Sequence, residues 1–166
     1  MSDGMRHVSV GPVTFGTDLP FVLVSGPCQL ETRDHALFLA ERLAAACAAA
    51  GVPFVFKASF DKANRTALDS PRGPGPDRGL RILADVRDRI GCPVTTDIHE
   101  ASQATAAAQA VDLLQIPAFL SRQTDLLVAA GRSGAAVNVK KGQFLAPWDM
   151  ANVAAKVTGA GKWAGR

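Results

Sequence analysis

The sequence lacks any long apolar run. No stretch of its 166 residues approaches the roughly 18 consecutive apolar residues that span a bilayer. The first residues, MSDGMRHVSVG, also lack the apolar region of a secretory signal. We therefore expect a cytoplasmic protein that does not associate with membranes.

Cysteine is scarce, with three residues at positions 28, 47 and 92. An odd number at wide spacing gives neither a disulfide framework nor a zinc-knuckle pattern. Cys47 falls on the apolar stripe of a predicted helix, and Cys92 stands beside a predicted strand. Both are expected in the core.

The chain also lacks a strong excess of charge. The net charge is +3 and charged residues make up 20% of the chain, which argues against a nucleic-acid partner and against disorder. The lysines gather instead at two places, 57 with 62 and 140 with 141, and this favours a small anionic ligand. The hydrophobic content of 48% is enough for a core, and we expect residues 1–166 to form a single domain.

Strand and helix patterns alternate along the chain. A small hairpin is expected within residues 1–17, from 7–10 and 13–15. The predicted strands of the main fold are 21–24, 54–56, 93–95, 111–116 and 135–139. The predicted helices are about 32–50, 77–90, 101–110, 122–132 and 147–157. This alternation over residues 18–166 predicts an α/β fold with a parallel sheet and right-handed crossovers.

Polar residues gather where the predicted strands end. These residues are Cys28, Lys57, Ser59, Asp97, His99, Gln115, Lys140 and Lys141. The carboxyl ends of parallel strands build the active site of α/β barrels and the ligand crevice of open sheets. A cationic mouth with a thiol, an imidazole and a carboxylate suits a phosphorylated substrate whose reaction moves protons or builds up an oxyanion. No nucleophilic triad is visible, and RGPGP at 72–76 is not a P-loop because no GK[ST] follows it.

The densest polar stretch is FVFKASFDKANR at 54–65, in which Lys57, Lys62 and Arg65 follow a short apolar run. Lysine supplies a point charge and arginine a planar fork that can bind two oxygens of an anion. The alternative is a solvated basic loop. The position after a core strand, with Ser59 and Asn64 interleaved, favours the anion site.

Five motifs carry a resemblance. They are GPC at 26–28, KASFDKANR at 57–65, TDIHE at 96–100, QIPAFLSRQTDL at 115–126 and NVKKGQFLAPWDM at 138–150. In this order they resemble the metal-using class of 3-deoxy-D-manno-octulosonate 8-phosphate synthases. The resemblance implies a (β/α)8 TIM barrel, of which about five β/α units are present. It also implies the condensation of phosphoenolpyruvate with D-arabinose 5-phosphate for lipopolysaccharide synthesis, by a homo-oligomer that is a homotetramer in the family.

The resemblance assigns roles to residues. Phosphoenolpyruvate would be bound by Lys57, Ser59, Lys62, Gln115 and Lys140, with Lys140 near its phosphate. Lys62 is the candidate catalytic group, polarising or protonating this substrate as its methylene carbon attacks the sugar aldehyde.

The resemblance also assigns a sugar-phosphate site. Asn64, Arg65 and Thr66 match its motif, although the family usually carries serine in place of Thr66. Asp97 would take sugar hydroxyls, and Arg122 resembles a residue that reaches the sugar phosphate of a neighbouring subunit.

Cys28 is the candidate metal ligand. A lone cysteine is more often a buried hydrophobe, but family members with cysteine at this position use a divalent metal and members with asparagine do not. The resemblance therefore implies zinc, iron or manganese, with the other ligands, a His, a Glu and an Asp, expected beyond the carboxyl terminus. His99 is as compatible with a structural role as with a functional one, and Phe144 and Trp148 are expected to pack over the fifth loop.

Two other functions remain open. One is a heptulosonate 7-phosphate synthase-like enzyme that uses erythrose 4-phosphate, although KANR at 62–65 differs from the Lys-Pro-Arg-Thr motif typical of that relative. The other is a non-catalytic sugar-phosphate-binding fragment, which would fit a chain that keeps the anion sites but lacks the His, Glu and Asp metal ligands. Five strands do not close an eight-stranded barrel, and the unpaired apolar edges favour aggregation or association.

Overall fold

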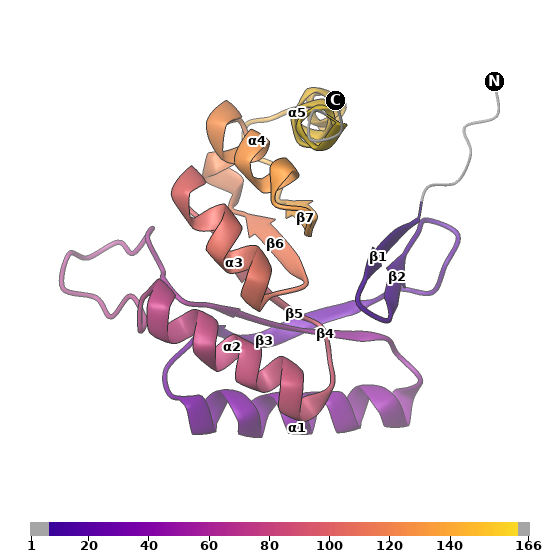
Figure 1. Ribbon diagram of the computed structural model, residues 1–166, viewed down its shortest axis with the longest axis vertical. Coiled ribbons are helices and arrows are strands. Elements are labelled where there is room, and N and C mark those ends of the chain that lie inside the picture. The colour runs from indigo at the N-terminus through magenta and orange to yellow at the C-terminus, as the bar shows by residue number, and fades with distance from the viewer. Residues whose placement is uncertain (1–6, 163–166) are drawn as a thin grey trace.

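The computed structural model describes residues 7–162, and Figure 1 shows their arrangement. The strands are β1 (Val8–Val10), β2 (Val13–Phe15), β3 (Leu23–Gln29), β4 (Phe54–Ser59), β5 (Val94–Asp97), β6 (Leu113–Ile116) and β7 (Ala136–Val139). The α-helices are α1 (Arg33–Ala50), α2 (Pro76–Ile90), α3 (Ala104–Ala110), α4 (Thr124–Arg132) and α5 (Met150–Lys162). Short 3-10 turns occupy 101–103, 118–120 and 147–149.

The sheet confirms the predicted fold class. Strands β3 to β7 form one parallel five-stranded sheet in sequence order, and an antiparallel hairpin of β1 and β2 precedes it. Helices α1 to α4 connect successive strands and lie along the outer side of the curved sheet (Figure 1). This is the arrangement of the first five units of a (β/α)8 barrel. The prediction that residues 1–166 form a single domain remains a prediction.

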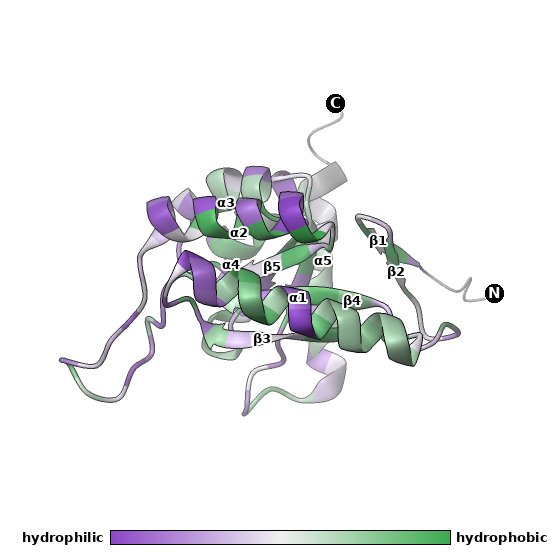
Figure 2. Ribbon diagram, turned by 90° about the horizontal axis from the view of Figure 1, so that it is seen from below, coloured by the Kyte–Doolittle hydropathy of each residue, from purple (hydrophilic) through white to green (hydrophobic). Residues whose placement is uncertain are grey.

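The two faces of β4 show how the sequence divides the sheet. Phe54, Phe56 and Ala58 belong to the hydrophobic core under the helices. Because side chains alternate along a strand, Lys57 and Ser59 lie on the opposite face, which is the inner face of the barrel. The helices match this division, and α2 carries hydrophobic and hydrophilic residues on different sides (Figure 2). The polar groups of the site are therefore built into the inner face.

Helix α1 shows why its boundaries could be predicted. The side chain of Thr32 caps its first turn by accepting a hydrogen bond from the backbone N–H of His35 at 3.2 Å. Gly51 ends it with a φ of 66°, in the left-handed region that suits glycine. Cys47 on this helix and Cys92 before β5 are both buried in the core, as predicted.

The first strand of the sheet differs from the prediction. Phe21 is 71% exposed, and β3 begins at Leu23 and continues through Cys28 to Gln29, so the Gly-Pro-Cys sequence does not terminate it. The register with β4 shifts between Ser25 and Cys28, and a β-bulge of this kind lets pairing resume past an irregularity. Gly26 is required in this stretch because a Cβ there would lie 1.9 Å from the Lys57 carbonyl oxygen.

The hairpin lies at the amino-terminal end of the strands. Gly11 in its turn approaches the side chains of Pro93 and Asp112, which precede β5 and β6. Apolar residues of the hairpin and of the sheet, together with Asn138 of β7, line a cavity of about 250 Å³. The hairpin thus covers the end of the sheet opposite to the predicted site. Among residues 7–162, no helix has the length and apolar character needed to cross a bilayer.

Candidate functional site

A row of polar side chains crosses the inner face of the sheet. Strand register pairs Asp97 of β5 with Gln115 of β6, and Gln115 with Asn138 of β7. Gln115 Nε2 donates to Asp97 Oδ1, and Asn138 Nδ2 donates to Gln115 Oε1 at 3.0 Å. Ser59 Oγ at the end of β4 donates to Asp97 Oδ2. The structure therefore brings Ser59, Asp97 and Gln115 together, as predicted.

Two lysines converge on this row. Lys57 Nζ and Lys62 Nζ donate to Ser59 Oγ at 2.8 and 2.9 Å. They lie 3.4 and 3.8 Å from Asp97 Oδ2. One carboxylate thus holds two ammonium groups, which leaves an excess of positive charge where the strands end.

Burial and charge shift the pKa values of this network. Burial alone would raise the pKa of Asp97, but the Lys57 ammonium and the hydrogen bonds from Ser59 and Gln115 lower it overall. Burial lowers the pKa of Lys57 despite the neighbouring carboxylate. Asp97 therefore remains ionised at neutral pH.

A cavity of about 540 Å³ opens over this row at Asp97, and Lys57, Ser59 and Gln115 do not line it. Its lining includes Lys62, Asn64, Asp97 and Lys140, which the sequence assigned to the site. It is completed by Asp61, Ala63, His99, Glu100, Pro117, Ala118, Phe119, Leu120 and Gln143. The volume suits a small ligand, and Lys62 and Lys140 are the cations of a lining that also holds the carboxylates of Asp61, Asp97 and Glu100.

Cys28 lies at the edge of the same network. Its side chain is exposed, its φ of 54° is left-handed, and Lys57 Nζ donates to its carbonyl oxygen at 3.1 Å. A hydrogen bond with Lys62 lowers the pKa of the thiol, and the charge of Lys57 adds to this effect. The lowered pKa makes the thiolate, the form that binds metals, easier to form here than at an ordinary cysteine. Within residues 7–162 no three His, Cys, Asp or Glu side chains are grouped as a metal site.

The predicted sugar-phosphate residues are only partly gathered. Asn64 lines the cavity, but Arg65, Thr66 and Arg122 do not. Arg65 donates to Gln29 Oε1 and, at 3.0 Å, to the Pro71 carbonyl oxygen.

Thr66 is exposed in the same loop as Arg65. Arg122 lies before α4, whose helix starts two residues later than predicted, and lines a separate cavity of about 210 Å³.

The structure also places His99 and the two aromatic residues predicted near the fifth loop. The His99 ring packs edge-on against Phe60, with centroids 6.2 Å apart, and its buried Nδ1 has no hydrogen-bond partner among the described residues. The prediction that Phe144 and Trp148 pack over the fifth loop is wrong, because they are 104% and 77% exposed. The loop between β7 and α5 leaves both rings outside the hydrophobic core.

Sequence reasoning missed Asn138 and the pair of Asp61 and Arg72. Asn138 stood inside a quoted motif, and a polar residue in the middle of a predicted strand was the available signal. Arg72 Nε and Nη2 donate to the two Asp61 carboxylate oxygens at 2.8 and 2.6 Å, and this bidentate pair closes the loop that carries Lys62.

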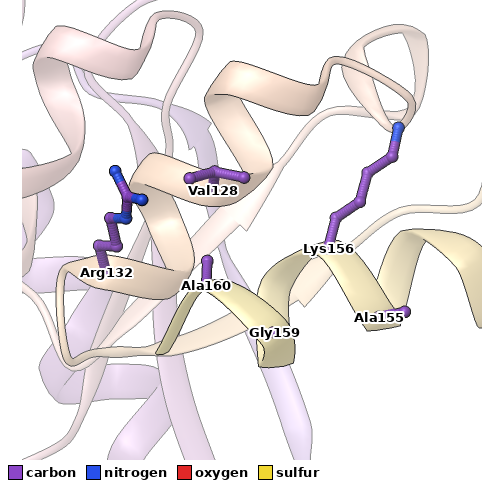
Figure 3. Close-up of a pocket in the computed structure, with 6 residues that line it drawn as sticks. All are labelled: Val128, Arg132, Ala155, Lys156, Gly159 and Ala160. Atoms are coloured by element: carbon purple, nitrogen blue, oxygen red, sulfur yellow. The ribbon is translucent and has the colours of Figure 1, made fainter. Parts of the chain in front are cut away.

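A further cavity, of about 340 Å³, lies between α4 and α5 (Figure 3). Small residues and the side chains of Arg132 and Lys156 line it. Lys156 Nζ reaches the start of α4, where it donates to the Arg122 carbonyl oxygen at 3.2 Å and to Thr124 Oγ1 at 2.8 Å. None of the predicted site residues lines this cavity.

His99 gives a prediction about pH. Burial lowers its pKa below the ordinary value of 6.5, so the folded protein prefers the neutral imidazole. As pH falls below 6.5, the unfolded state takes up the proton first and the free energy of unfolding decreases. We expect His99→Gln to reduce the loss of stability between about pH 7 and 5, as measured by urea midpoints. His35→Gln on α1 is the control, and an equal loss in both variants would contradict the assignment.

The parallel sheet, with helices along its outer side and two lysines at the carboxyl ends of its strands, defines a segment of a β/α-barrel fold. The chain belongs to the DAHP synthetase I family, whose model matches residues 5–165. Curated relatives named 2-dehydro-3-deoxyphosphooctonate aldolase include one from Granulibacter bethesdensis, 62% identical over 156 residues, covering 94% of this chain and 55% of the relative. Others are from Rhodopseudomonas palustris, 59% identical over 93% of this chain and 54% of the relative, and Rickettsia rickettsii, 55% identical over 92% and 56%.

That name denotes the same enzyme as the synthase that the five motifs resemble, so the recognition from sequence is confirmed. The chain spans about half the length of the curated relatives it matches.

Proposed function

We propose that the protein condenses phosphoenolpyruvate with D-arabinose 5-phosphate, giving 3-deoxy-D-manno-octulosonate 8-phosphate and inorganic phosphate for lipopolysaccharide synthesis. The observation that carries this proposal is the convergence of Lys57 and Lys62 on the row formed by Ser59, Asp97 and Gln115. The names of the relatives support it.

In this proposal phosphoenolpyruvate lies against the inner row. Lys57, Ser59 and Gln115 bind its polar groups, and Lys140, across the cavity, binds its phosphate. Lys62 lies beside both Ser59 and the cavity, where its ammonium polarises or protonates this substrate while the methylene carbon attacks the aldehyde. Such charge-assisted donors stabilise the negative charge that develops during the reaction.

The sugar phosphate occupies the outer part of the cavity. Asp97 accepts hydrogen bonds from its hydroxyl groups, and Asn64, Arg65 and Thr66 bind its phosphate. Because Arg122 lies outside the cavity, it acts in this proposal on the site of a neighbouring subunit in a homotetramer. We also propose a cytoplasmic location, which follows from phosphorylated substrates.

A phosphate-release assay on the full-length protein tests the function. We expect turnover with phosphoenolpyruvate and arabinose 5-phosphate, and much slower turnover with erythrose 4-phosphate. A preference for the four-carbon sugar would support the heptulosonate-type alternative. Calorimetric binding of phosphoenolpyruvate by the full-length protein, without turnover of either sugar, would support a binding module.

We propose further that Cys28 is a ligand of a divalent zinc, iron or manganese ion. Its exposed thiol and the lowered thiol pKa fit this role. In this proposal the remaining ligands lie outside residues 7–162, where no three His, Cys, Asp or Glu side chains are grouped. When bound, such an ion supplies Lewis-acid polarisation of a substrate oxygen.

Metal removal gives the matching prediction. Treating the full-length protein with a chelator is expected to abolish turnover, and adding back a divalent ion is expected to restore it. Metal content measured in parallel on wild type and Cys28→Ala should fall in the variant. Unchanged turnover after chelation would remove Cys28 from a metal site.

A further inference from the structure

Asn138 ends a hydrogen-bonded chain that crosses three neighbouring strands. Its Nδ2 donates to Gln115 Oε1 at 3.0 Å, and Gln115 Nε2 donates to Asp97 Oδ1. The three residues are direct partners in the strand register, so the backbone of the sheet fixes their spacing.

The direction of this chain follows from chemistry. An ionised carboxylate accepts hydrogen bonds and donates none, so Gln115 must turn its NH₂ group toward Asp97. The Gln115 carbonyl oxygen then faces Asn138, which must donate to it. Only one orientation of the Gln115 amide satisfies both neighbours.

Asp97 in turn places both lysines of the site. Its Oδ1 is held by Gln115, while its Oδ2 accepts from Ser59 and faces Lys57 and Lys62 at 3.4 and 3.8 Å. A Gln115 amide in the reversed orientation would put a carbonyl oxygen against the carboxylate, and the carboxylate would turn away from the lysines.

We propose that Asn138 is a positioning residue of the phosphoenolpyruvate site, where it fixes the Gln115 amide and, through it, the carboxylate between Lys57 and Lys62. The inference rests on the proposed function. Asn138 lines the cavity beneath the hairpin and not the cavity over the row, so in this inference it acts through Gln115.

Two substitutions in the full-length enzyme separate orientation from shape. Asn138→Leu removes the donor and is expected to lower kcat/KM for phosphoenolpyruvate about tenfold, as for a lost hydrogen bond that orients the buried Gln115 amide. Asn138→Asp keeps the size but accepts from Gln115, so it favours the reversed amide, and a larger loss is expected. Asn152→Asp on the exposed side of α5 adds the same charge elsewhere and should stay within about twofold of wild type.

A double-mutant cycle with Gln115→Leu tests the route of the effect. If Asn138 acts through Gln115, then Asn138→Leu and Asn138→Asp add less than about twofold to the loss caused by Gln115→Leu alone. Losses that multiply would mean that Asn138 acts directly or by its charge, and would overturn the inference.

Measuring wild-type enzyme in the same assay separates the proposed function from the proposed positioning role of Asn138. A wild type that does not turn over phosphoenolpyruvate with arabinose 5-phosphate refutes the proposed function. An active wild type together with folded Asn138→Asp of equal kcat/KM refutes the positioning role alone. Melting midpoints of each variant establish that the compared proteins are folded.

Discussion

Replacing Lys62 by methionine is expected to lower kcat by roughly 10²- to 10⁴-fold, the range for removal of a general acid or base. Lys62 lines the cavity and lies 2.9 Å from Ser59 Oγ and 3.8 Å from Asp97 Oδ2. Methionine keeps the apolar stem and removes the ammonium group. Because Lys57 still pairs with Asp97 at 3.4 Å, the fold should survive. Steady-state kinetics of the full-length enzyme measure the effect.

A second variant and a control define what Lys62 contributes. Lys62→Arg keeps the positive charge, but its guanidinium does not release a proton. If Lys62 donates a proton to the substrate, the kcat of Lys62→Arg should therefore be as low as that of Lys62→Met. Nearly full activity in Lys62→Arg would reduce the role to charge alone. Lys141→Met is the matched control, because among residues 7–162 Lys141 Nζ donates to the carbonyl oxygens of Gly142 and Leu145 in its own loop and does not line the cavity. A similar loss in both Lys→Met variants would contradict the assignment of Lys62.

The alternation of strands and helices could be predicted because each short apolar run was bounded by glycine, proline or a capping residue. The first strand could not be placed correctly by the same rule. Gly26 and Pro27 are usually strand breakers, but in β3 a register shift accommodates them and the close approach to β4 requires the glycine. The carboxyl end of β3 is decided by its pairing with β4, which is distant in the sequence. The local residue pattern around Gly26 and Pro27 holds no information about that pairing.

The site was predictable where sequence position fixes side-chain direction. Side chains alternate between the two faces of a strand. At or near the strand ends, this alternation places residues 57, 59, 97 and 115 on the same, inner face of the sheet. Arg65 and Arg122 lie in loops, and their placement depends on contacts such as that of Arg65 with Gln29. The exposure of Phe144 and Trp148 likewise depends on which surfaces meet, and no local pattern encodes that.

Asp97 is expected to be the most important single residue for the stability of the site. Replacing it by asparagine leaves Lys57 and Lys62 close together without their shared anion. The side chain of Asp97 is 7% exposed and that of each lysine 14%. Removing one partner of a buried ion pair costs roughly 3–5 kcal/mol, and with this slight exposure we expect about 3 kcal/mol for Asp97→Asn. Urea denaturation of the full-length protein measures the change.

The matched control is Asp61→Asn. Asp61 pairs with an arginine, Arg72, whose side chain is 57% exposed against 19% for Asp61, and a pair with one solvent-exposed partner is expected to contribute about 1 kcal/mol. Equal losses in the two variants would show that the inner row is not a specially buried network.

Two further measurements tie the loss to the ion pair. The pKa of Asp97 is lowered in the folded protein, so its ionised form contributes stability above the unfolded value near 4, and this contribution is lost as pH falls through the folded value. The free energy of unfolding of Asp97→Asn should therefore fall less steeply than that of wild type as the pH is lowered.

The second measurement uses a double variant. Adding Lys57→Met to Asp97→Asn removes an unpaired buried charge and should recover part of the lost stability. A double variant less stable than Asp97→Asn would mean that packing around Lys57, and not charge balance, holds the row together.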